Sequence, residues 1–251
     1  MRMSKNRHKI LLIGDSCIDE YQYGTVDRIS PEAPVPVFRF DYLETKPGMA
    51  ANVLENFKSL DCDVDFITGN VSKKTRFIDL RSHQHIIRID QDVQSDSVVF
   101  DSIVSFDYDA IVISDYNKGT VSYDLVEKIC QHYKGPIFID TKKTDLARLA
   151  DCFIKINELE YKNRKTDGNH VIVTLGSKGA VYRNRDHEEF YATQVEDVTD
   201  VCGAGDTFLA ALVYKYLDTN DIASSIRFAN RAASVTVQHI GVYAPRLEEI
   251  L

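Results

Sequence analysis

The clearest pattern along the chain is a series of short apolar runs that end in small or polar residues. The first run occupies residues 10–13 and stops at Gly14 and Asp15. Comparable runs follow at residues 64–68, 110–114, 136–140, 152–156 and 171–175. A continuous apolar run of this length is typical of a strand that is buried on both faces. The pattern therefore predicts buried strands whose polar ends gather at one edge of a sheet.

Between these runs, apolar residues recur at helical spacing. Residues 50–60 carry one apolar stripe, and residues 125–133 carry another after Ser122, a residue type that caps helix starts. In the last quarter, residues 203–217 and 221–237 repeat apolar positions at spacings of three and four. Strand and helix therefore alternate. This order predicts an α/β fold, with a mostly parallel sheet, helices on both faces and ligands at the carboxyl ends of the strands.

Two segments interrupt the alternation. Residues 35–40 follow a proline-rich stretch, and residues 75–90 contain two strand-like pieces without a helix. We expect a small β-strand lid, with strands from about residues 22–42 and 75–91, on a single domain that spans residues 1–251. A layer of this kind closes a site against water. Because its edges and apolar face would be exposed in a lone copy, we expect a homodimer that pairs through the lid strands.

Composition narrows the class of protein. The chain has 30 Lys and Arg against 38 Asp and Glu, and its net charge of −8 excludes nucleic-acid binding through bulk positive charge. No window approaches 18 consecutive apolar residues, and residues 1–9 are charged without an apolar signal region, so we expect no membrane association and no export. The five cysteines are widely spaced and include no C-x-x-C pair, which indicates reduced thiols in the cytoplasm.

The strongest local signal is a glycine-containing turn at residues 203–206 that leads into an amphipathic helix. Such a helix start binds anions through its free N–H groups and its partial positive charge. Asp206 lies at this start, where a bound anion would repel its carboxylate. General-base work on a hydroxyl that attacks a phosphoryl group would justify that position. The alternative is an acid that stabilises the first turn of an ordinary helix.

The Gly-Ala-Gly-Asp sequence of this turn resembles the signature of the ribokinase-like (PfkB) carbohydrate kinases. An ordered series of further matches, at residues 14–19, 28–36, 46–53, 80–81, 86–90, 114–119, 139–142 and 198–200, extends the resemblance over almost the whole chain. Within the family the series is most similar to the heptose-7-phosphate kinases. The resemblance implies a ribokinase-like fold and ATP-dependent, Mg²⁺-requiring phosphorylation of the anomeric hydroxyl of D-glycero-D-manno-heptose 7-phosphate to the 1,7-bisphosphate.

The chain also departs from the family pattern. Met49 stands where such kinases usually carry a second glycine, which puts a large side chain where the backbone should approach the sugar. A kinase for another sugar or sugar phosphate therefore stays open, as does a non-catalytic protein that binds a sugar phosphate or a nucleotide. Because no nucleotidyltransferase domain follows residue 251 in this sequence, we expect the kinase activity alone.

The resemblance assigns catalytic roles to the turn, with Asp206 as the base and with backbone N–H groups that hold the phosphoryl charge at Gly203, Ala204 and Gly205. Carboxylates and amides accept or donate hydrogen bonds to sugar hydroxyls, and cations bind a substrate phosphate. The expected substrate-binding residues are Asp15, Asp19, Gly48, Asn52, Arg88 and Lys118. For Asp15 the alternative is a turn, for Asn52 a local cap, and for both cations a solvated surface position.

The nucleotide side rests on the resemblance to the family's N-x-x-E motif and to its strand-end turn. The expected nucleotide-binding residues are Asn157, Glu160, Thr174, Gly176, Gly179 and Asn230. Glu160 is expected to approach Mg²⁺ indirectly, through water, because Mg²⁺ keeps several of its waters in proteins. The alternative for the Asn157 segment is two acids that open an ordinary helix.

Overall fold

The computed structural model describes residues 7–185, 187–193 and 197–251, and these form a large sheet and a small one. The order of strands in the large sheet is β12-β11-β10-β9-β8-β7-β1-β4. Its strands are β1 (Lys9–Gly14), β4 (Asp63–Thr68), β7 (Ala110–Asp115), β8 (Ile137–Thr141), β9 (Phe153–Asn157), β10 (His170–Thr174), β11 (Gly179–Asn184) and β12 (His187–Ala192).

The six strands from β4 to β10 run parallel, and β11 and β12 extend the sheet with antiparallel pairs. All six apolar runs in the sequence lie in these parallel strands, so that prediction is confirmed. Side chains of β1 alternate between the two faces, as the strand period of two requires. Leu12 packs with one apolar cluster, whereas Leu11 and Ile13 pack with another on the opposite face.

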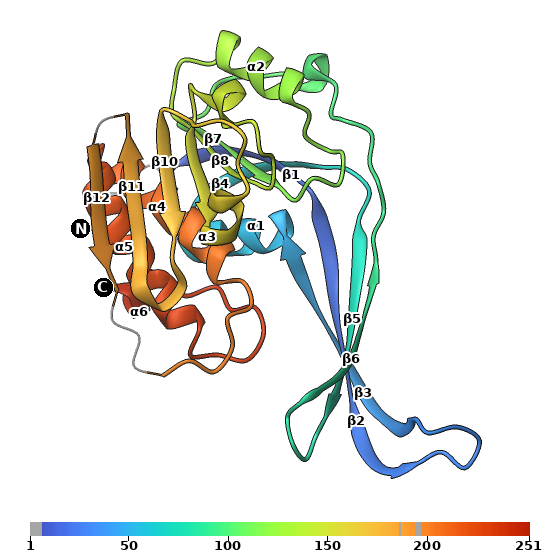
Figure 1. The fold of residues 1–251 in the computed structure, drawn as a ribbon. Coiled ribbons are helices and arrows are strands. Elements are labelled where there is room, and N and C mark those ends of the chain that lie inside the picture. The colour runs from blue at the N-terminus through green and yellow to red at the C-terminus, as the bar shows by residue number, and fades with distance from the viewer. Residues whose placement is uncertain (1–6, 186, 194–196) are drawn as a thin grey trace.

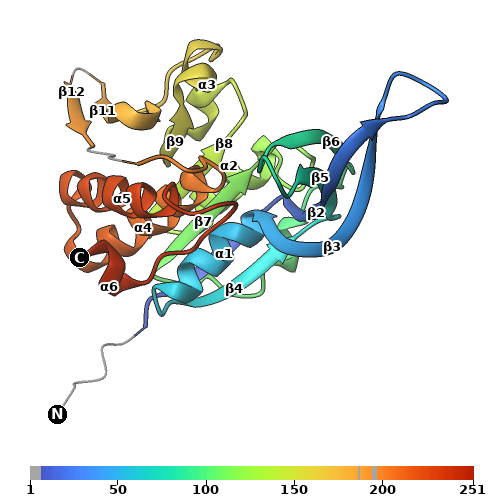
Figure 2. The same cartoon turned by 90° about the horizontal axis from the view of Figure 1, so that it is seen from below.

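Helices cover both faces of this sheet. The first cluster packs against α1 (Ala50–Ser59), α4 (Ala204–Thr219), α5 (Ile222–Thr236) and α6 (Leu247–Ile250). Figure 2 shows α1, α4 and α5 side by side across the sheet. The second cluster packs against α2 (Tyr123–His132), with Tyr161 of α3 (Glu158–Lys162) at its margin. Ser122 caps α2 as predicted, because its hydroxyl accepts a hydrogen bond from the N–H of Leu125.

The small sheet has the order β3-β2-β5-β6 and projects from the body of the molecule (Figure 1). Its strands are β2 (Ser16–Ile29), β3 (Pro36–Met49), β5 (Ser72–Asp79) and β6 (His85–Gln91), which contain and extend the segments expected in the lid. We call these four strands the lid sheet. Because β2 follows β1 after one residue and β3 runs directly into α1, the lid sheet starts at the carboxyl edge of the large sheet.

Three short 3-10 helices complete the secondary structure of the described ranges: η1 (Phe100–Ser102), η2 (Leu146–Leu149) and η3 (Gly176–Lys178). Within the same ranges, no helix combines the length and apolar character needed to cross a bilayer. The five cysteines are free thiols.

The junction between β3 and α1 is strained. Met49 has a φ of 57° and a ψ of −133°, a conformation that favours glycine. Its side chain is buried, with 5% of its surface exposed, so packing holds the residue in this conformation. Such a backbone geometry costs on the order of 1–3 kcal/mol for a residue with a Cβ. Met49, which stands where the family pattern has a second glycine, therefore keeps a backbone conformation that favours glycine beside the expected sugar site.

Candidate active site

A buried carboxylate occupies the point where α4 meets the carboxyl edge of the large sheet. Asp206 lies in the first turn of α4 with 5% of its surface exposed. It accepts hydrogen bonds of 2.9 Å from Asn52 Nδ2 and from the hydroxyl of Tyr116. Gly203 begins the helix with a φ of 79°, and a Cβ at this position would lie 2.8 Å from Asn52 Nδ2. The turn thus needs glycine both for its conformation and for its contact with Asn52.

Burial sets the acidity of this carboxylate. Desolvation is the main cause that raises the pKa of Asp206, from the ordinary 3.8 to about 6, against the opposing hydrogen bond from Asn52. Burial also raises the pKa of the Tyr116 hydroxyl well above 10. This group therefore stays protonated and donates a hydrogen bond to Asp206. Above pH 6 the site therefore holds an ionised, oriented base with a fixed donor on one side.

A buried ion pair lies beside this base, and the sequence analysis missed it. Lys155 Nζ is 2.5 Å from Asp140 Oδ2, and Lys155 is buried. The two residues are partners in register on the adjacent strands β8 and β9. The available signal was a charged residue inside each of two apolar runs, a position that charges occupy only when they are paired. Asp140 raises the pKa of Asp206 and Lys155 lowers it, so the pair belongs to the same electrostatic site.

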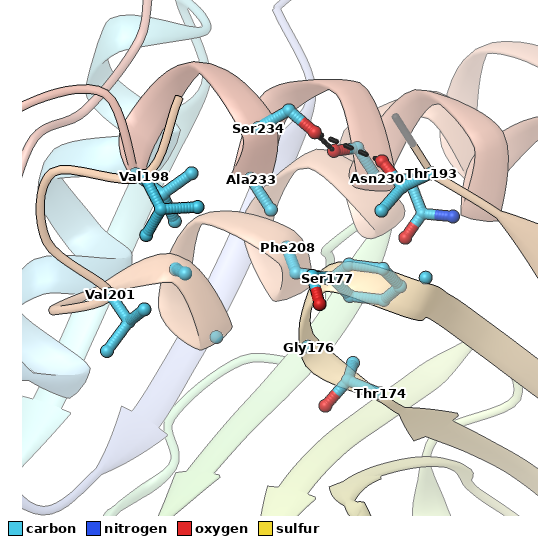
Figure 3. A pocket seen from close by; sticks show the side chains of 14 residues that line it. Thr174, Gly176, Ser177, Thr193, Val198, Val201, Phe208, Asn230, Ala233 and Ser234 are labelled. Atoms are coloured by element: carbon cyan, nitrogen blue, oxygen red, sulfur yellow. Dashed lines mark hydrogen bonds between the residues drawn. The ribbon is translucent and has the colours of Figure 1, made fainter. Parts of the chain in front are cut away.

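A pocket of about 360 Å³ adjoins the start of α4. Figure 3 shows side chains of α4 and α5 that face the turn after β10. Four of the expected nucleotide-binding residues line it, together with two residues of the glycine turn: Thr174, Gly176, Gly179, Asn230, Ala204 and Gly205. Several apolar side chains complete the wall: Val198, Val201, Phe208, Ala233 and Val237. The pocket therefore brings the late sequence motifs together next to Asp206.

The other expected nucleotide residues form a helix cap. Asn157 Oδ1 accepts a hydrogen bond from the N–H of Glu160, and the carboxylate of Glu160 accepts one from the N–H of Asn157. Glu160 also accepts a hydrogen bond of 2.9 Å from Lys142 Nζ. Neither Asn157 nor Glu160 lines the pocket. These contacts establish the capping role that was the alternative, and contact with a nucleotide or metal stays a prediction.

Asp15 holds a loop from the other half of the chain. Its carboxylate is 1% exposed and accepts hydrogen bonds from the N–H groups of Tyr116, Lys118 and Thr120. These bonds fix the segment after β7 that supplies the hydroxyl beside Asp206. Asp15 therefore has a structural role, and its contact with a sugar stays a prediction.

Asp19, the other expected sugar carboxylate, forms a buried ion pair with Arg76 at 2.5 Å. Gly48 packs against this pair, because a Cβ on Gly48 would overlap Asp19 Oδ2. The sequence analysis did not single out Arg76, although its position in β5 directly opposite Arg88 of β6 places both side chains on one face of the lid sheet. Arg76 is therefore the buried arginine of this face, whereas Arg88 is exposed.

The two cations that were expected to bind phosphate already have acidic partners. Arg88 pairs with Asp90 on its own strand, and its side chain is 55% exposed. Lys118 pairs with Asp92 at 2.5 Å and is 21% exposed. The contact of Arg88 fits the surface alternative because its side chain is mostly exposed, whereas Lys118 is only partly exposed. Neither cation is in contact with Asp206 or lines the pocket beside it.

The fold of the described residues defines a class of protein, one with a ribokinase-like fold. Ribokinase from Thermotoga maritima superposes with a TM-score of 0.70 at 15% identity, covering 97% of this chain and 98% of its own. Phosphofructokinase-2 from Escherichia coli superposes with a TM-score of 0.73 at 13% identity, covering 97% of both chains. At these identities the likeness confirms the fold that the sequence predicted.

The sequence matches then place the chain within this class. The model of the pfkB family carbohydrate kinases matches residues 141–250. Bifunctional protein HldE from a Nitratiruptor species is 29% identical over 300 residues, which cover 96% of this chain and 64% of the relative. Bifunctional protein HldE from Pasteurella multocida is 31% identical over 291 residues, 93% of this chain and 60% of the relative. Residues 141–250 therefore match the pfkB family carbohydrate kinases, and almost the whole chain is similar to the HldE proteins.

The relatives are longer than this chain. The chain spans about 60–64% of the length of the two HldE proteins. The first alignment also runs over 300 positions, whereas the whole chain has 251 residues, so the relative has segments within the matched region that this chain lacks.

Proposed function

We propose that this kinase transfers the γ-phosphoryl group of ATP to the anomeric hydroxyl of D-glycero-D-manno-heptose 7-phosphate. The observation that carries the proposal is Asp206, a buried base with a pKa of about 6, placed at a glycine turn that also lines a pocket of nucleotide-compatible size. The HldE relatives and the ordered motif series support the heptose substrate.

The geometry supplies the parts that phosphoryl transfer needs. Asp206 accepts the proton of the sugar hydroxyl while the oxygen of that hydroxyl forms a bond to the γ-phosphorus. The bond from that phosphorus to the bridging oxygen breaks, and its electron pair leaves with ADP. The N–H groups of Gly203, Gly205 and Asp206 hold the charge on the transferred group, whereas the N–H of Ala204 donates to the Val201 carbonyl at 3.3 Å. Asn52 and Tyr116 keep the base in one orientation throughout.

The nucleotide would occupy the pocket between α4, α5 and the turn after β10. Its apolar wall suits an adenine ring, and the glycines at its turn leave backbone N–H groups accessible to phosphate. Mg²⁺ bound with the nucleotide would neutralise phosphate charge. Glu160 fits a water-mediated contact with that ion, because its partly exposed carboxylate has acceptor capacity beyond its bonds to Lys142 and the Asn157 N–H.

Two lysines near the base favour an anionic sugar. Lys74 of the lid sheet and Lys142 after β8 have their Nζ atoms 5.9 and 5.2 Å from the centre of the Tyr116 ring. The Tyr116 hydroxyl is bonded to Asp206, so both cations lie close to the expected reaction centre. Lys74 comes from the lid sheet, and Lys142, which also pairs with Glu160, follows β8. A neutral sugar would gain little from this charge, whereas a sugar phosphate would be attracted to it.

A kinase for a different sugar phosphate is the second candidate, and the backbone of Met49 favours it. The buried side chain of this residue adjoins Gly48, next to the Asp19 carboxylate that is expected to bind the sugar. A changed wall at this point would change which sugar fits, while the Asp206 base would work as before.

The test is ADP release from MgATP with a panel of acceptors: D-glycero-β-D-manno-heptose 7-phosphate, sedoheptulose 7-phosphate, fructose 6-phosphate and ribose. We expect turnover with the heptose phosphate in the wild type and a loss of about 10²- to 10⁴-fold in Asp206→Asn. Turnover with another acceptor alone would replace the proposed substrate. Turnover that Asp206→Asn leaves unchanged would refute the base, and no turnover with any acceptor would favour the binding-protein alternative.

We also propose that two copies pair through the lid sheet. Four apolar side chains on the face of the lid sheet opposite Asp19 and Arg76 are 44–54% exposed: Ile18, Leu43, Ile87 and Ile89. An exposed apolar sheet face of this kind favours burial against another surface. Light scattering should give the mass of a dimer at micromolar concentration, and Ile87→Glu should give a monomer. A monomeric wild type would contradict the pairing.

A further inference from the structure

Lys155 is a buried cation whose position stability alone does not explain. It is 5% exposed, and its ammonium pairs with Asp140 on the neighbouring strand. The free energy needed to desolvate two charges is about as large as the free energy gained from their attraction. A buried ion pair of this kind therefore adds little to the stability of a fold. Burial even raises the pKa of Asp140, which shows that the acid itself is unfavourably placed. A pair of apolar residues would serve the sheet equally well at this position.

The ammonium of Lys155 points at the glycine turn. A Cβ built on Gly205 would lie 2.9 Å from Lys155 Nζ, the nearest heavy atom to that position. The lysine can approach the helix start this closely because residue 205 has no side chain. An ammonium has three N–H donors, and the Asp140 oxygen at 2.5 Å takes one. Two donors remain, and the ammonium that carries them lies next to Gly205.

The space beside the turn is the one in which the transferred group must lie. Gly205 and Ala204 line the pocket beside the start of α4, and the Asp206 base is the next residue of the same helix. The charge of Lys155 is felt at the base, because it lowers the pKa of Asp206. A helix start and a buried cation thus converge on one volume between the pocket and the base. Both favour an anion there.

We propose that Lys155 is a further catalytic residue, whose ammonium contacts the oxygens of the γ-phosphoryl group while that group moves from ADP to the acceptor. This inference rests on the proposed function as a kinase and deepens it. Lys155 exchanges no proton; it contributes charge-assisted hydrogen bonds that strengthen as charge develops on the transferred group. Asp140 holds the ammonium beside the turn through their ion pair. The contact is specific for a nucleoside triphosphate, because ADP has no third phosphoryl group.

The matched variants are Asp140→Asn, Lys155→Met and the double variant. Lys155→Met alone leaves a buried acid without a partner and is at risk of misfolding, whereas the double variant replaces a charged pair with a neutral one. Asp140→Asn alone likewise leaves a buried ammonium without a partner, so the double variant is compared with the wild type. Lys128→Met, on α2 away from the site, controls for the loss of one positive charge.

The first readout is the affinity for MgATP and for MgADP, measured by calorimetry without any sugar. We expect the ratio of ATP to ADP affinity to fall about tenfold or more in the double variant relative to the wild type, since a buried charge-assisted contact to the third phosphate is lost. The second readout is turnover, which should fall about 10²- to 10³-fold, the usual effect of removing one donor to a transition-state oxyanion.

Two results would overturn the inference. If the double variant regains the ATP preference and turnover of the wild type, Lys155 only neutralises Asp140. If the ratio of affinities is equal in the double variant and in the wild type while turnover falls, the ammonium does not touch the third phosphate. Failure of the proposed function is distinct from both results, because a wild type that binds no MgATP would refute the kinase proposal and the role of Lys155 together, before any variant is compared.

Discussion

Replacing the buried base should stabilise the protein, and the gain should depend on pH. The pKa of Asp206 is about 6 in the folded chain and has its ordinary value of 3.8 when solvated. A difference of about 2 pKa units corresponds to roughly 3 kcal/mol of unfavourable free energy for holding the ionised form in the folded state. Asp206→Asn removes this charge and keeps the shape of the side chain. The variant should therefore exchange catalysis for stability.

The hydrogen bonds reduce the gain. The amide introduced by Asp206→Asn can keep the bond from Tyr116 on its carbonyl oxygen, but its NH₂ group would face the NH₂ group of Asn52. The Asn52 amide must turn over, which breaks its weak 3.4 Å contact with Asn56 Nδ2 and costs about 1 kcal/mol. The net expectation is about 2 kcal/mol of added unfolding free energy near pH 8.

The sign of the pH dependence follows from proton binding. The folded wild type binds the Asp206 proton more tightly than the unfolded chain does, so its stability falls as pH rises from about 4 to about 6 and then stays level. Asp206→Asn lacks this fall, so its advantage should shrink by more than about 1 kcal/mol between pH 8 and pH 5. Urea unfolding at both pH values measures this, with Asp101→Asn at an exposed position as the charge control.

The same experiment can refute the reasoning. A gain of equal size at both pH values would show that a titrating Asp206 is not its cause. A variant that is less stable than the wild type near pH 8 would show that burial does not destabilise the carboxylate, and the pKa of about 6 would then be wrong.

Three further predictions concern the base and the lid. Because Asp206 must be ionised, kcat/KM should rise with pH and level off above about 6, and a profile flat through this range would contradict the base. Arg76→Met should lower the unfolding free energy by about 3–5 kcal/mol by leaving Asp19 unpaired, whereas exposed Arg88→Met should change it by less than about 0.5 kcal/mol; equal losses would count against the buried pair. Gly48→Ala should cost about 1–3 kcal/mol through its clash with Asp19, and an unchanged urea midpoint would exclude that clash.

Much of the architecture was accessible from the sequence. The six apolar runs became the parallel strands, because strands covered on both faces must be apolar at every position. Ser122 caps its helix, and the glycine turn starts α4, because both depend on local backbone conformation. The α/β fold followed from this alternation, and the family of kinases from the motifs along it.

The site itself was only partly accessible. The pocket collects Thr174, Gly176, Gly179 and Asn230 as expected, because their motifs lie at strand ends and on the helix that face it. The expectation that Arg88, rather than Arg76, binds a substrate phosphate has no such support. Strand alternation puts both on one face of the lid sheet, but their burial depends on how that sheet meets the body of the molecule.

The sequence by itself determined the strands, the helices, the glycine turn and the presence of an acid at its end, because spacing, burial and backbone preference act over a few residues. Only the tertiary structure decided what that acid can do. Its pKa comes from burial among Asn52, Tyr116 and Lys155, which lie on separate elements. Likewise, the pairing of Lys155 with Asp140 requires two neighbouring strands in register. Electrostatic interactions depend on distance in space and on the exclusion of water, and neither is written in the order of residues.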